Sequence, residues 1–221
     1  MISRAEGYRR SVGKERLGLE VAQNFLHTVL SECSALVDDR VLNYTHGDLV
    51  VASGKYIEVK TQPIDPTRYR QNFVELFEKT QKQEHADGFD RVARLLGMAP
   101  DCLASTRVTS RETPNLPLGM LPYVSVSIES FSTAACVMYV NPYFQTKYVY
   151  CYEKPFLRSQ IAHALATKGL GRGLGNSNRD TFSVFIDYPD AVWSFDHDTG
   201  WRYAGAASEQ HVKAALQTCL T

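Results

Sequence analysis

The sequence predicts a mixed α/β domain, and three observations support that class. Apolar residues repeat with a helical period near the start of the chain. Three short runs rich in β-branched and aromatic residues come next, and helix-like and strand-like segments alternate from there to residue 221. An order of helix, three strands, helix, loop, strands, helix, strands and helix, with no internal repeat, suits a mixed α/β domain.

The composition is that of an ordinary globular protein. With 221 residues the chain is long enough for one domain with a substantial core, or for one domain that carries an insertion. Hydrophobic residues make up 44% of the chain, yet no apolar run approaches the length needed to cross a bilayer. The first residues contain arginines but no apolar signal region, so we expect a cytoplasmic protein without a membrane segment.

The five cysteines are scattered along the chain without a C-x-x-C pair. An odd number without paired spacing argues against both a disulfide framework and a structural zinc site. We therefore expect reduced thiols, most of them buried.

A long helix and a strand meander are the first expected elements. An apolar residue recurs at every fourth position from Leu17 to Val29, which predicts an amphipathic helix over residues 12–36. Three strands are expected at residues 41–46, 48–52 and 56–61, separated by Gly47 and by Ser53-Gly54.

The later elements follow from local composition. Phe73, Leu76 and Phe77 suggest a second helix over residues 67–86, and a short helix is expected to end near Met98. Four prolines predict a long surface loop over residues 99–122. Further strands are expected within residues 123–131, 135–140, 147–152, 181–188 and 191–196, and further helices at residues 155–169 and from about Ser208.

Three charged residues stand out in the second hairpin of the meander. Residues two apart on a strand share a face, so Glu58 and Lys60 point the same way and Val59 points to the opposite layer. Metal-dependent phosphodiester hydrolysis needs hard oxygen ligands and a cation that steadies developing negative charge. Asp48 and Glu58 supply such oxygens, the backbone carbonyl of Val59 is another ordinary ligand for a hard cation, and Lys60 supplies the charge.

This site requires a particular strand register. Asp48 shares a face with Glu58 only if even-numbered residues face even-numbered residues, as in a pairing of Val50 with Glu58. We therefore predict a three-residue Ser53-Gly54-Lys55 turn with Gly54 or Lys55 in a left-handed conformation, or a bulge that restores the parity.

The pattern of Gly47-Asp48, nine further residues and Glu58-Val59-Lys60 resembles the PD-(D/E)XK nuclease superfamily, which includes type II restriction enzymes and archaeal-type Holliday-junction resolvases. Gly47 stands where the motif has proline. The resemblance implies a restriction-endonuclease-like αβββαβ core with a mixed sheet, over residues 12–98 plus a later strand, followed by additional strands and helices in residues 123–221. It covers less than half of the chain, which we interpret as a single nuclease domain.

The resemblance also implies an activity, that of a DNA endonuclease dependent on Mg²⁺, or on Mn²⁺ as a substitute. Asp48, Glu58 and the Val59 carbonyl would hold the metal, and Lys60 would act on water and the phosphate. Many members add a glutamate from the first helix, and here Glu15 falls within the apolar arc of the predicted helix whereas Glu20 falls outside it. We prefer Glu15, although its position in the first turn also suits a carboxylate favoured by the helix dipole. The simpler alternative for the whole group is a solvated hairpin with incidental charges.

Basic residues gather in the later part of the chain, although the formal net charge is zero. Residues 147–179 carry six basic residues against one acidic residue, which suits a phosphate-facing segment, and a solvated helix face with a loop is the alternative. The residues expected to contact DNA are Thr61, Gln62, Lys154, Arg158, Lys168, Arg172 and Arg179.

The substrate within the nuclease class is left open. The neutral net charge and the large unmatched second half favour a duplex-specific, restriction-like enzyme over a junction resolvase or an exonuclease, since base contacts need added elements. Family analogy suggests a homodimer. The alternative outside the class of enzymes is an inactive DNA-binding or assembly protein that keeps the same fold.

Overall fold

The computed structural model describes residues 4–39, 42–43, 46–61, 72–78, 93–94, 97–109, 116–117, 134–142, 146–167, 170–172, 181–186 and 191–221. The chain forms two compact units, each built from separate segments. The first unit comprises residues 1–68, 133–154 and 189–221, and the second comprises residues 69–132 and 155–188.

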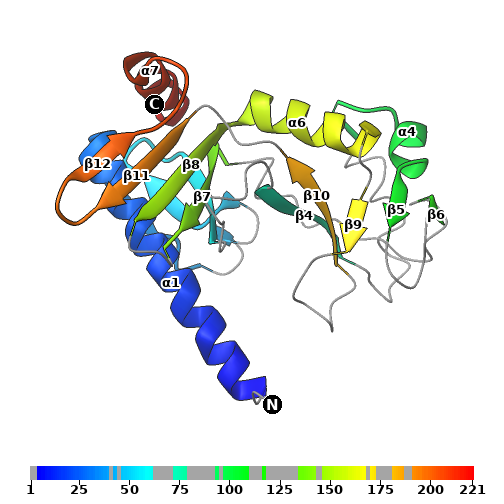
Figure 1. Cartoon of the computed structure of the whole chain (residues 1–221), viewed down its shortest axis with the longest axis horizontal. Coiled ribbons are helices and arrows are strands. Elements are labelled where there is room, and N and C mark those ends of the chain that lie inside the picture. Colours follow the sequence, from blue (N-terminus) through cyan, green and yellow to red (C-terminus); the bar gives the residue numbers. More distant parts are fainter. Residues whose placement is uncertain are drawn as a thin grey trace. The chain divides into compact units, whose positions relative to one another are not determined.

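A seven-stranded mixed sheet organises the first unit (Figure 1). Strands β3 and β7 run parallel, whereas every other neighbouring pair in the sheet is antiparallel. The α/β class is therefore confirmed, with strands from both ends of the chain in one sheet. In spatial order the strands are β1 (Ser34–Leu36), β2 (Leu49–Val51), β3 (Tyr56–Thr61), β7 (Cys136–Asn141), β8 (Lys147–Glu153), β11 (Val192–Asp196) and β12 (Gly200–Tyr203).

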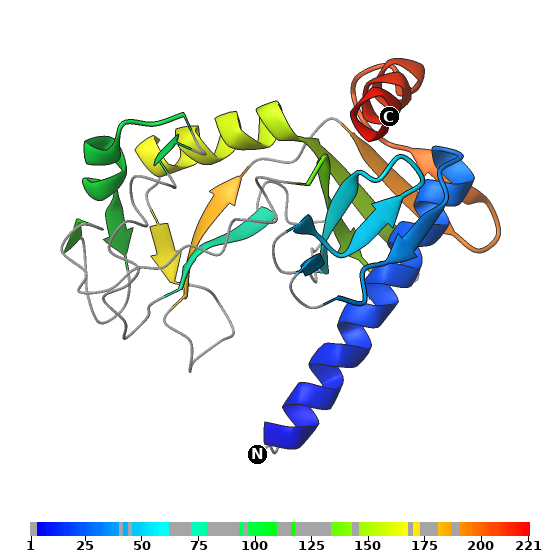
Figure 2. The ribbon, with the colours of Figure 1, turned by 180° about the vertical axis from the view of Figure 1, so that it is seen from behind.

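Helices α1 (Arg4–Val29) and α7 (Glu209–Leu220) share one hydrophobic core with a single face of this sheet. Seen from behind, α1 crosses in front of the strands (Figure 2). On β3 the core face is formed by Ile57 and Val59, which are both buried. Glu58 and Lys60 alternate with them and belong to the other face, as the period of two in a strand requires.

The thiols divide between this core and the surface. All five cysteines are free, as expected. Cys136 and Cys151 are buried, and burial raises the pKa of the Cys151 thiol well above its usual value. Cys33 and Cys102 are exposed, so the expectation that most of the thiols are buried is wrong.

Helix α1 ends earlier than its apolar stripe predicts. Ser31 has a left-handed backbone with φ of 59°, and the Glu32 N–H donates to the Leu26 carbonyl at 2.9 Å. This bond spans six residues, one more than the bond that usually closes a helix, and glycine is the usual residue at the left-handed position. Residues 34–36, predicted as the last turn of the helix, form β1 instead.

The meander exists, but its first strand was predicted in the wrong place. Leu42, Asn43 and His46 are helical rather than extended. The Leu42 N–H donates to Asp39 Oδ1 at 3.0 Å and the Asn43 N–H to the Asp39 carbonyl at 2.8 Å. Asp39 thus starts a helical turn, and β1 takes the place of residues 41–46 beside β2.

Hydrogen bonds between distant parts of the chain hold the first unit together. Trp201 Nε1 donates to Asn24 Oδ1 of α1 at 2.8 Å, and Gln217 Nε2 of α7 donates to the Leu30 carbonyl at 3.0 Å. The Ser53 hydroxyl, in the β2–β3 turn, donates to the carbonyl of Leu220.

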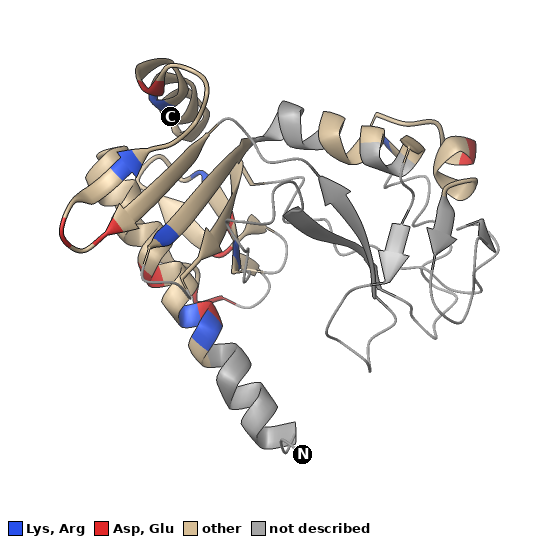
Figure 3. Ribbon diagram, in the orientation of Figure 1, with Lys and Arg blue, Asp and Glu red and all other residues tan. Residues whose placement is uncertain are grey.

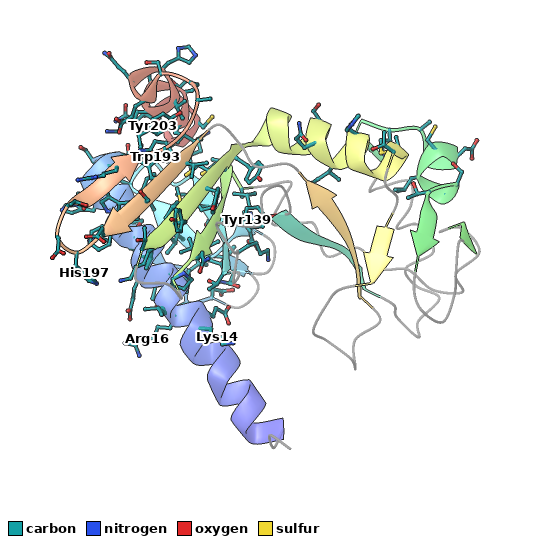
Figure 4. All side chains as sticks on the ribbon, viewed as in Figure 1. Lys14, Arg16, Tyr139, Trp193, His197 and Tyr203 are labelled. Atoms are coloured by element: carbon teal, nitrogen blue, oxygen red, sulfur yellow. The ribbon has the colours of Figure 1, made fainter. Side chains whose placement is uncertain are left out.

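Aromatic rings fill the core beside these bonds. The Phe25 ring of α1 lies 5.0 Å from the Trp193 ring and 5.2 Å from the Trp201 ring, centroid to centroid. Trp193 also packs on Tyr203 at 5.1 Å, and both residues are labelled in Figure 4. The β11–β12 hairpin is thereby fixed to α1.

The second unit contains a five-stranded sheet and corrects two predictions. Residues 72–78, expected in a helix, form β4, which pairs antiparallel with β10. Within residues 99–122, expected as a loop, lie α4 (Pro100–Ala104), β5 (Arg107–Thr109) and β6 (Leu116–Pro117). The expected strand at residues 123–131 lies outside the described residues. The sheet order is β4 (Asn72–Glu78), β10 (Thr181–Ile186), β9 (Leu170–Arg172), β5 and β6.

The short helix expected to end near Met98 lies mostly outside the described residues, and the other predicted elements are confirmed within a few residues. They are β7, β8, β10, β11, α7 and the helix α6 (Lys154–Thr167). Among the helices that the structure describes, none combines the length and apolar character required to cross a membrane.

Candidate active site

The β2–β3 hairpin has the register parity that the candidate site requires. Leu49 pairs with Ile57 and Val50 with Tyr56, so even-numbered residues of the two strands share a face. The predicted partner of Val50 was Glu58, two residues further along. The parity is therefore confirmed and the particular pairing is corrected.

A three-residue turn sets this register. The Gly54 N–H donates to the Val51 carbonyl at 2.9 Å, and the Val51 N–H donates to the Lys55 carbonyl at 3.0 Å. Gly54 is left-handed with φ of 82°, as a three-residue hairpin loop demands. The turn has the predicted length and the predicted left-handed glycine, but it consists of residues 52–54 rather than 53–55.

The Asp48 carboxylate is held in place from two sides. Its Oδ2 accepts the Val59 N–H of β3 at 2.8 Å, and its Oδ1 accepts the Asn43 side-chain amide at 3.1 Å. The Asp48 N–H donates in turn to the Ile57 carbonyl at 2.9 Å. Asp48 is thus fixed against β3, because one carboxylate oxygen is bonded to Val59 and the other to Asn43.

Gly47 allows the backbone before Asp48 to approach the backbone of β3 closely. A Cβ atom at Gly47 would lie 2.8 Å from the Ile57 carbonyl oxygen, a distance that real Cβ atoms essentially never show. Its φ of 139° also lies in a region that residues with side chains rarely adopt. The residue that replaces the proline of the motif is therefore required here by space and by backbone conformation.

Glu58 and Lys60 form an ion pair on β3. The Glu58 side chain is only 6% exposed, whereas that of Lys60 is 38% exposed. A buried carboxylate needs a compensating charge, and the more exposed Lys60 ammonium provides it for Glu58.

The two carboxylates interact electrostatically. Burial, together with the charge of Glu58, raises the pKa of Asp48 to about 6, although the Val59 N–H, Lys60 and Asn43 act in the opposite direction. Two neighbouring carboxylates that resist simultaneous ionisation are relieved by a divalent cation, and hard oxygen donors are those that Mg²⁺ prefers. The donor chemistry of Asp48 and Glu58 therefore fits a magnesium ion.

The glutamate predicted from the first helix does not join this pair. Among the described residues, no group of three or more acidic, histidine or cysteine side chains is arranged to hold a metal ion. Glu15 is exposed, and the alternative Glu20 is an exposed partner of Arg16 at 3.2 Å. Figure 3 shows this part of α1 as interleaved basic and acidic residues, as on a solvated helix face.

The residues predicted to contact DNA are spread over both units. Thr61 packs against Gly18 of α1, because a Cβ atom at Gly18 would lie 1.9 Å from the Thr61 hydroxyl oxygen. Its side chain is thus on the helix side of β3, away from Glu58 and Lys60. Lys154 and Arg158 belong to α6 and Arg172 belongs to β9, while Gln62, Lys168 and Arg179 lie outside the described residues.

Sequence reasoning missed Tyr139 of β7, which is labelled in Figure 4 and which the strand pairing places on the same face of the sheet as Lys60. Strand β7 runs parallel to β3 with Tyr139 beside Lys60 and Val137 beside Glu58. Burial raises the pKa of Tyr139 well above its usual value, and so do the neighbouring Tyr152 and Glu58. The sequence shows only that Tyr139 and Val137 share a face of their strand, because nothing local identifies β3 as the neighbour.

No protein-family model, no curated protein and no solved structure matches this chain. The resemblance to the PD-(D/E)XK nucleases therefore stays a prediction carried by the hairpin residues.

Proposed function

We propose that this protein is a Mg²⁺-dependent endodeoxyribonuclease that hydrolyses phosphodiester bonds in duplex DNA, in the manner of a type II restriction enzyme. The observation that carries the proposal is the β2–β3 hairpin, where Asp48, Glu58 and Lys60 share one face and Asp48 is fixed by the Val59 N–H. Two anionic ligands beside one accessible cation are the groups that metal-assisted phosphodiester hydrolysis needs.

The roles follow from the contacts of each residue. Asp48 and Glu58, with the Val59 carbonyl, would hold the ion, and hydrogen bonds from Asn43 and Val59 restrict the Asp48 carboxylate. When bound, Mg²⁺ lowers the pKa of a water ligand and neutralises charge on the phosphate. The Lys60 ammonium, paired with Glu58 in this structure, would turn to the phosphate and stabilise its developing charge.

The basic segment 147–179 would bind the DNA backbone, since its six cations face only one anion in sequence. A homodimer would place one site on each strand of the duplex. A four-way junction or a DNA end would be the substrate if the enzyme is a resolvase or an exonuclease.

One observation favours a second candidate, a non-catalytic DNA-binding or assembly protein. The Glu58–Lys60 ion pair satisfies both charges without a ligand, and the described residues contain no third acidic group at the site. Such a protein would keep the hairpin for stability and bind DNA through the basic segment alone.

Cleavage assays separate these candidates. The full chain would be incubated with supercoiled, linear and four-way-junction DNA in Mg²⁺, Mn²⁺, Ca²⁺ or a chelator, with Asp48→Ala as the inactive control. The proposal expects cutting in Mg²⁺ and Mn²⁺ only, because the looser Ca²⁺ shell positions the nucleophile poorly. DNA binding without cutting in any metal would favour the non-catalytic protein, and cutting of the junction alone would identify a resolvase.

A further inference from the structure

We infer that Tyr139 is a positioning residue of the candidate metal site, whose hydroxyl donates a hydrogen bond to the Glu58 carboxylate when a divalent cation is bound. The inference rests on the metal-binding part of the proposed function. It assigns a task to a side chain that the hairpin motif does not contain.

The first observation is an unsatisfied hydroxyl in a fully buried place. Tyr139 has no measurable exposure, and its hydroxyl has no hydrogen-bond partner among the described residues. A buried polar group without a partner destabilises a protein by roughly 1–3 kcal/mol, so such groups are rare and a catalytic or ligand-binding role is one explanation for them.

The second observation is the position of Tyr139 in the strand beside the site. Tyr139 pairs with Lys60 across the parallel strands. Val137 pairs with Glu58, and this pair is the neighbouring one on the same face of the sheet. Residues paired across neighbouring strands share a face, so Tyr139 lies on the face that carries Glu58 and Lys60, and a phenol hydroxyl can donate to a carboxylate. The Tyr139 ring is held edge-on against Tyr152, with the centroids 5.3 Å apart and the planes at 77°.

The third observation is the present partner of Glu58. Lys60 occupies Glu58 Oε1 in this structure, and the proposed chemistry requires Lys60 to turn to the phosphate. The carboxylate that loses this partner while it ligates a metal needs another donor, because ligating carboxylates are themselves held by hydrogen bonds. Tyr139 supplies a donor on the same face of the sheet, and no bond is broken or proton transferred in the exchange.

The test is the variant Tyr139→Phe in the full chain, studied by calorimetric titration with Ca²⁺ and Mg²⁺ and by thermal unfolding in a chelator. We expect the affinity for the metal to fall by about 10–100-fold, the usual effect of removing a hydrogen bond to a ligand. The melting temperature in chelator should stay the same or rise, because the variant removes a hydroxyl that has no partner in the metal-free protein.

Two matched controls remove a hydroxyl elsewhere. Ser34, in the edge strand β1, carries the other buried hydroxyl without a partner among the described residues, so Ser34→Ala should leave metal affinity unchanged. Tyr152→Phe removes a phenol next to Tyr139 on the same face and should also leave it unchanged.

The outcomes separate this inference from the proposed function. Equal metal affinities of the wild type and Tyr139→Phe would overturn the inference alone, as would a lower melting temperature in chelator with unchanged affinity. A wild type that binds no divalent cation would overturn the metal site as well.

A second measurement follows the phenol itself. Infrared difference spectra of the protein with labelled tyrosine should show one phenol band that shifts on addition of Mg²⁺, and the shift should vanish in Tyr139→Phe at saturating Mg²⁺. Absence of the shift in a wild type that binds Mg²⁺ would contradict the role of Tyr139.

Discussion

At the scale of single residues, the Lys60 ammonium pairs with the Glu58 carboxylate in the structure, and in the proposed reaction it would turn to a phosphate. Its side chain is 38% exposed, compared with 6% for that of Glu58. It cannot ligate a cation while it is charged, so its contribution to the proposed reaction is separable from metal binding.

Lys60→Ala should therefore reduce the rate of cleavage by at least ~10²-fold, the scale expected for losing one electrostatic stabiliser. DNA binding and Ca²⁺ binding should stay near those of the wild type. Asp48→Ala and Glu58→Ala should instead lose metal affinity and cleavage together. Single-turnover cleavage in Mg²⁺ and calorimetry in Ca²⁺ measure the two effects, and a Lys60→Ala protein that cuts at the normal rate would place this lysine on an ordinary solvated strand.

Asp48 gives the metal-free protein a stability that depends on pH. Its pKa is about 6 in the folded protein, above the ordinary value near 4 in the unfolded chain, chiefly because of burial. Between about pH 4 and pH 6 the folded protein binds the proton more tightly than the unfolded chain, so the free energy of unfolding falls as the pH rises through this window.

Asp48→Asn removes that loss, because the amide cannot ionise while its oxygen can still accept the Val59 N–H. The free energy of unfolding of the variant minus that of the wild type should therefore be larger at pH 8 than at pH 5, by about 1–2 kcal/mol. Urea unfolding in chelator at the two pH values measures this change. The same difference between the proteins at both pH values would contradict the assignment.

At the scale of elements, the packing of α1 on β3 depends on one glycine. A Cβ atom at Gly18 would lie 1.9 Å from the hydroxyl oxygen of Thr61 and 2.9 Å from its Cβ. Rotation of the Thr61 side chain cannot move its Cβ, so the helix and the strand would have to separate.

Gly18→Ala should therefore destabilise the protein by about 1–3 kcal/mol, as overpacking usually does. Gly13 in the same helix is the matched control, because nothing lies within 4 Å of a Cβ atom placed there. Gly13→Ala should stabilise the protein by about 0.5–1 kcal/mol through its better helix propensity. Chemical unfolding of the two variants checks the contrast, and an equal response would show that Gly18 is not a contact position.

The elements that were predicted well are those whose signals are local. Strand β8 is predicted by its β-branched and aromatic residues. The register parity of the β2–β3 hairpin follows from its short turn with a left-handed glycine. The charged group at Asp48, Glu58 and Lys60 was predictable for the same reason, since it needs only the period of a strand and one turn.

The elements that were predicted wrongly depend on distant partners. Phe73 and Phe77 have helical spacing in the sequence, but in β4 they pair with Phe185 and Phe182 of β10, which local periodicity cannot show. Tyr139 was missed because β7 pairs with β3, a strand far away in the sequence, and no local pattern shows this pairing. The end of α1 was missed because Ser31, rather than a glycine, adopts the left-handed conformation.

At the scale of the whole molecule, the two compact units are interleaved in the sequence. The core that the nuclease resemblance implies, residues 12–98, contains only the first three strands of the seven-stranded sheet. The neighbour of β3 on its other side, β7, and every strand beyond it come from later residues.

A fragment of residues 1–98 should therefore fail to fold cooperatively. It lacks β7 beside β3, and it lacks Trp193, which is fully buried against Phe25 in the intact chain. Circular dichroism during heating should show a sigmoidal transition for the full chain and a gradual change for the fragment. A cooperative transition in the fragment would mean that the first three strands and α1 suffice for a stable core.

The basic segment offers a test of DNA binding that is independent of the metal. Charge reversal at Arg158, Lys168 or Arg172 should weaken DNA binding and reduce the slope of log affinity against log salt by about one for each phosphate that the variant no longer neutralises. Calcium binding should be unaffected. Unchanged affinity and slope would place the DNA-binding surface elsewhere.

The hydrogen bonds that join Asn24 to Trp201, Leu30 to Gln217 and Ser53 to Leu220 have a consequence for biosynthesis. A ribosome that has just finished β3 has already made Asp48, Glu58 and Lys60, but β7, β8, β11 and β12, which complete their sheet, are added only later. Pairings of such long sequence separation fold slowly, and a nascent chain must wait for them with apolar strands exposed. The charged group should therefore assemble only after synthesis of residues 191–220, so a ribosome that stalls earlier would release a product without the site.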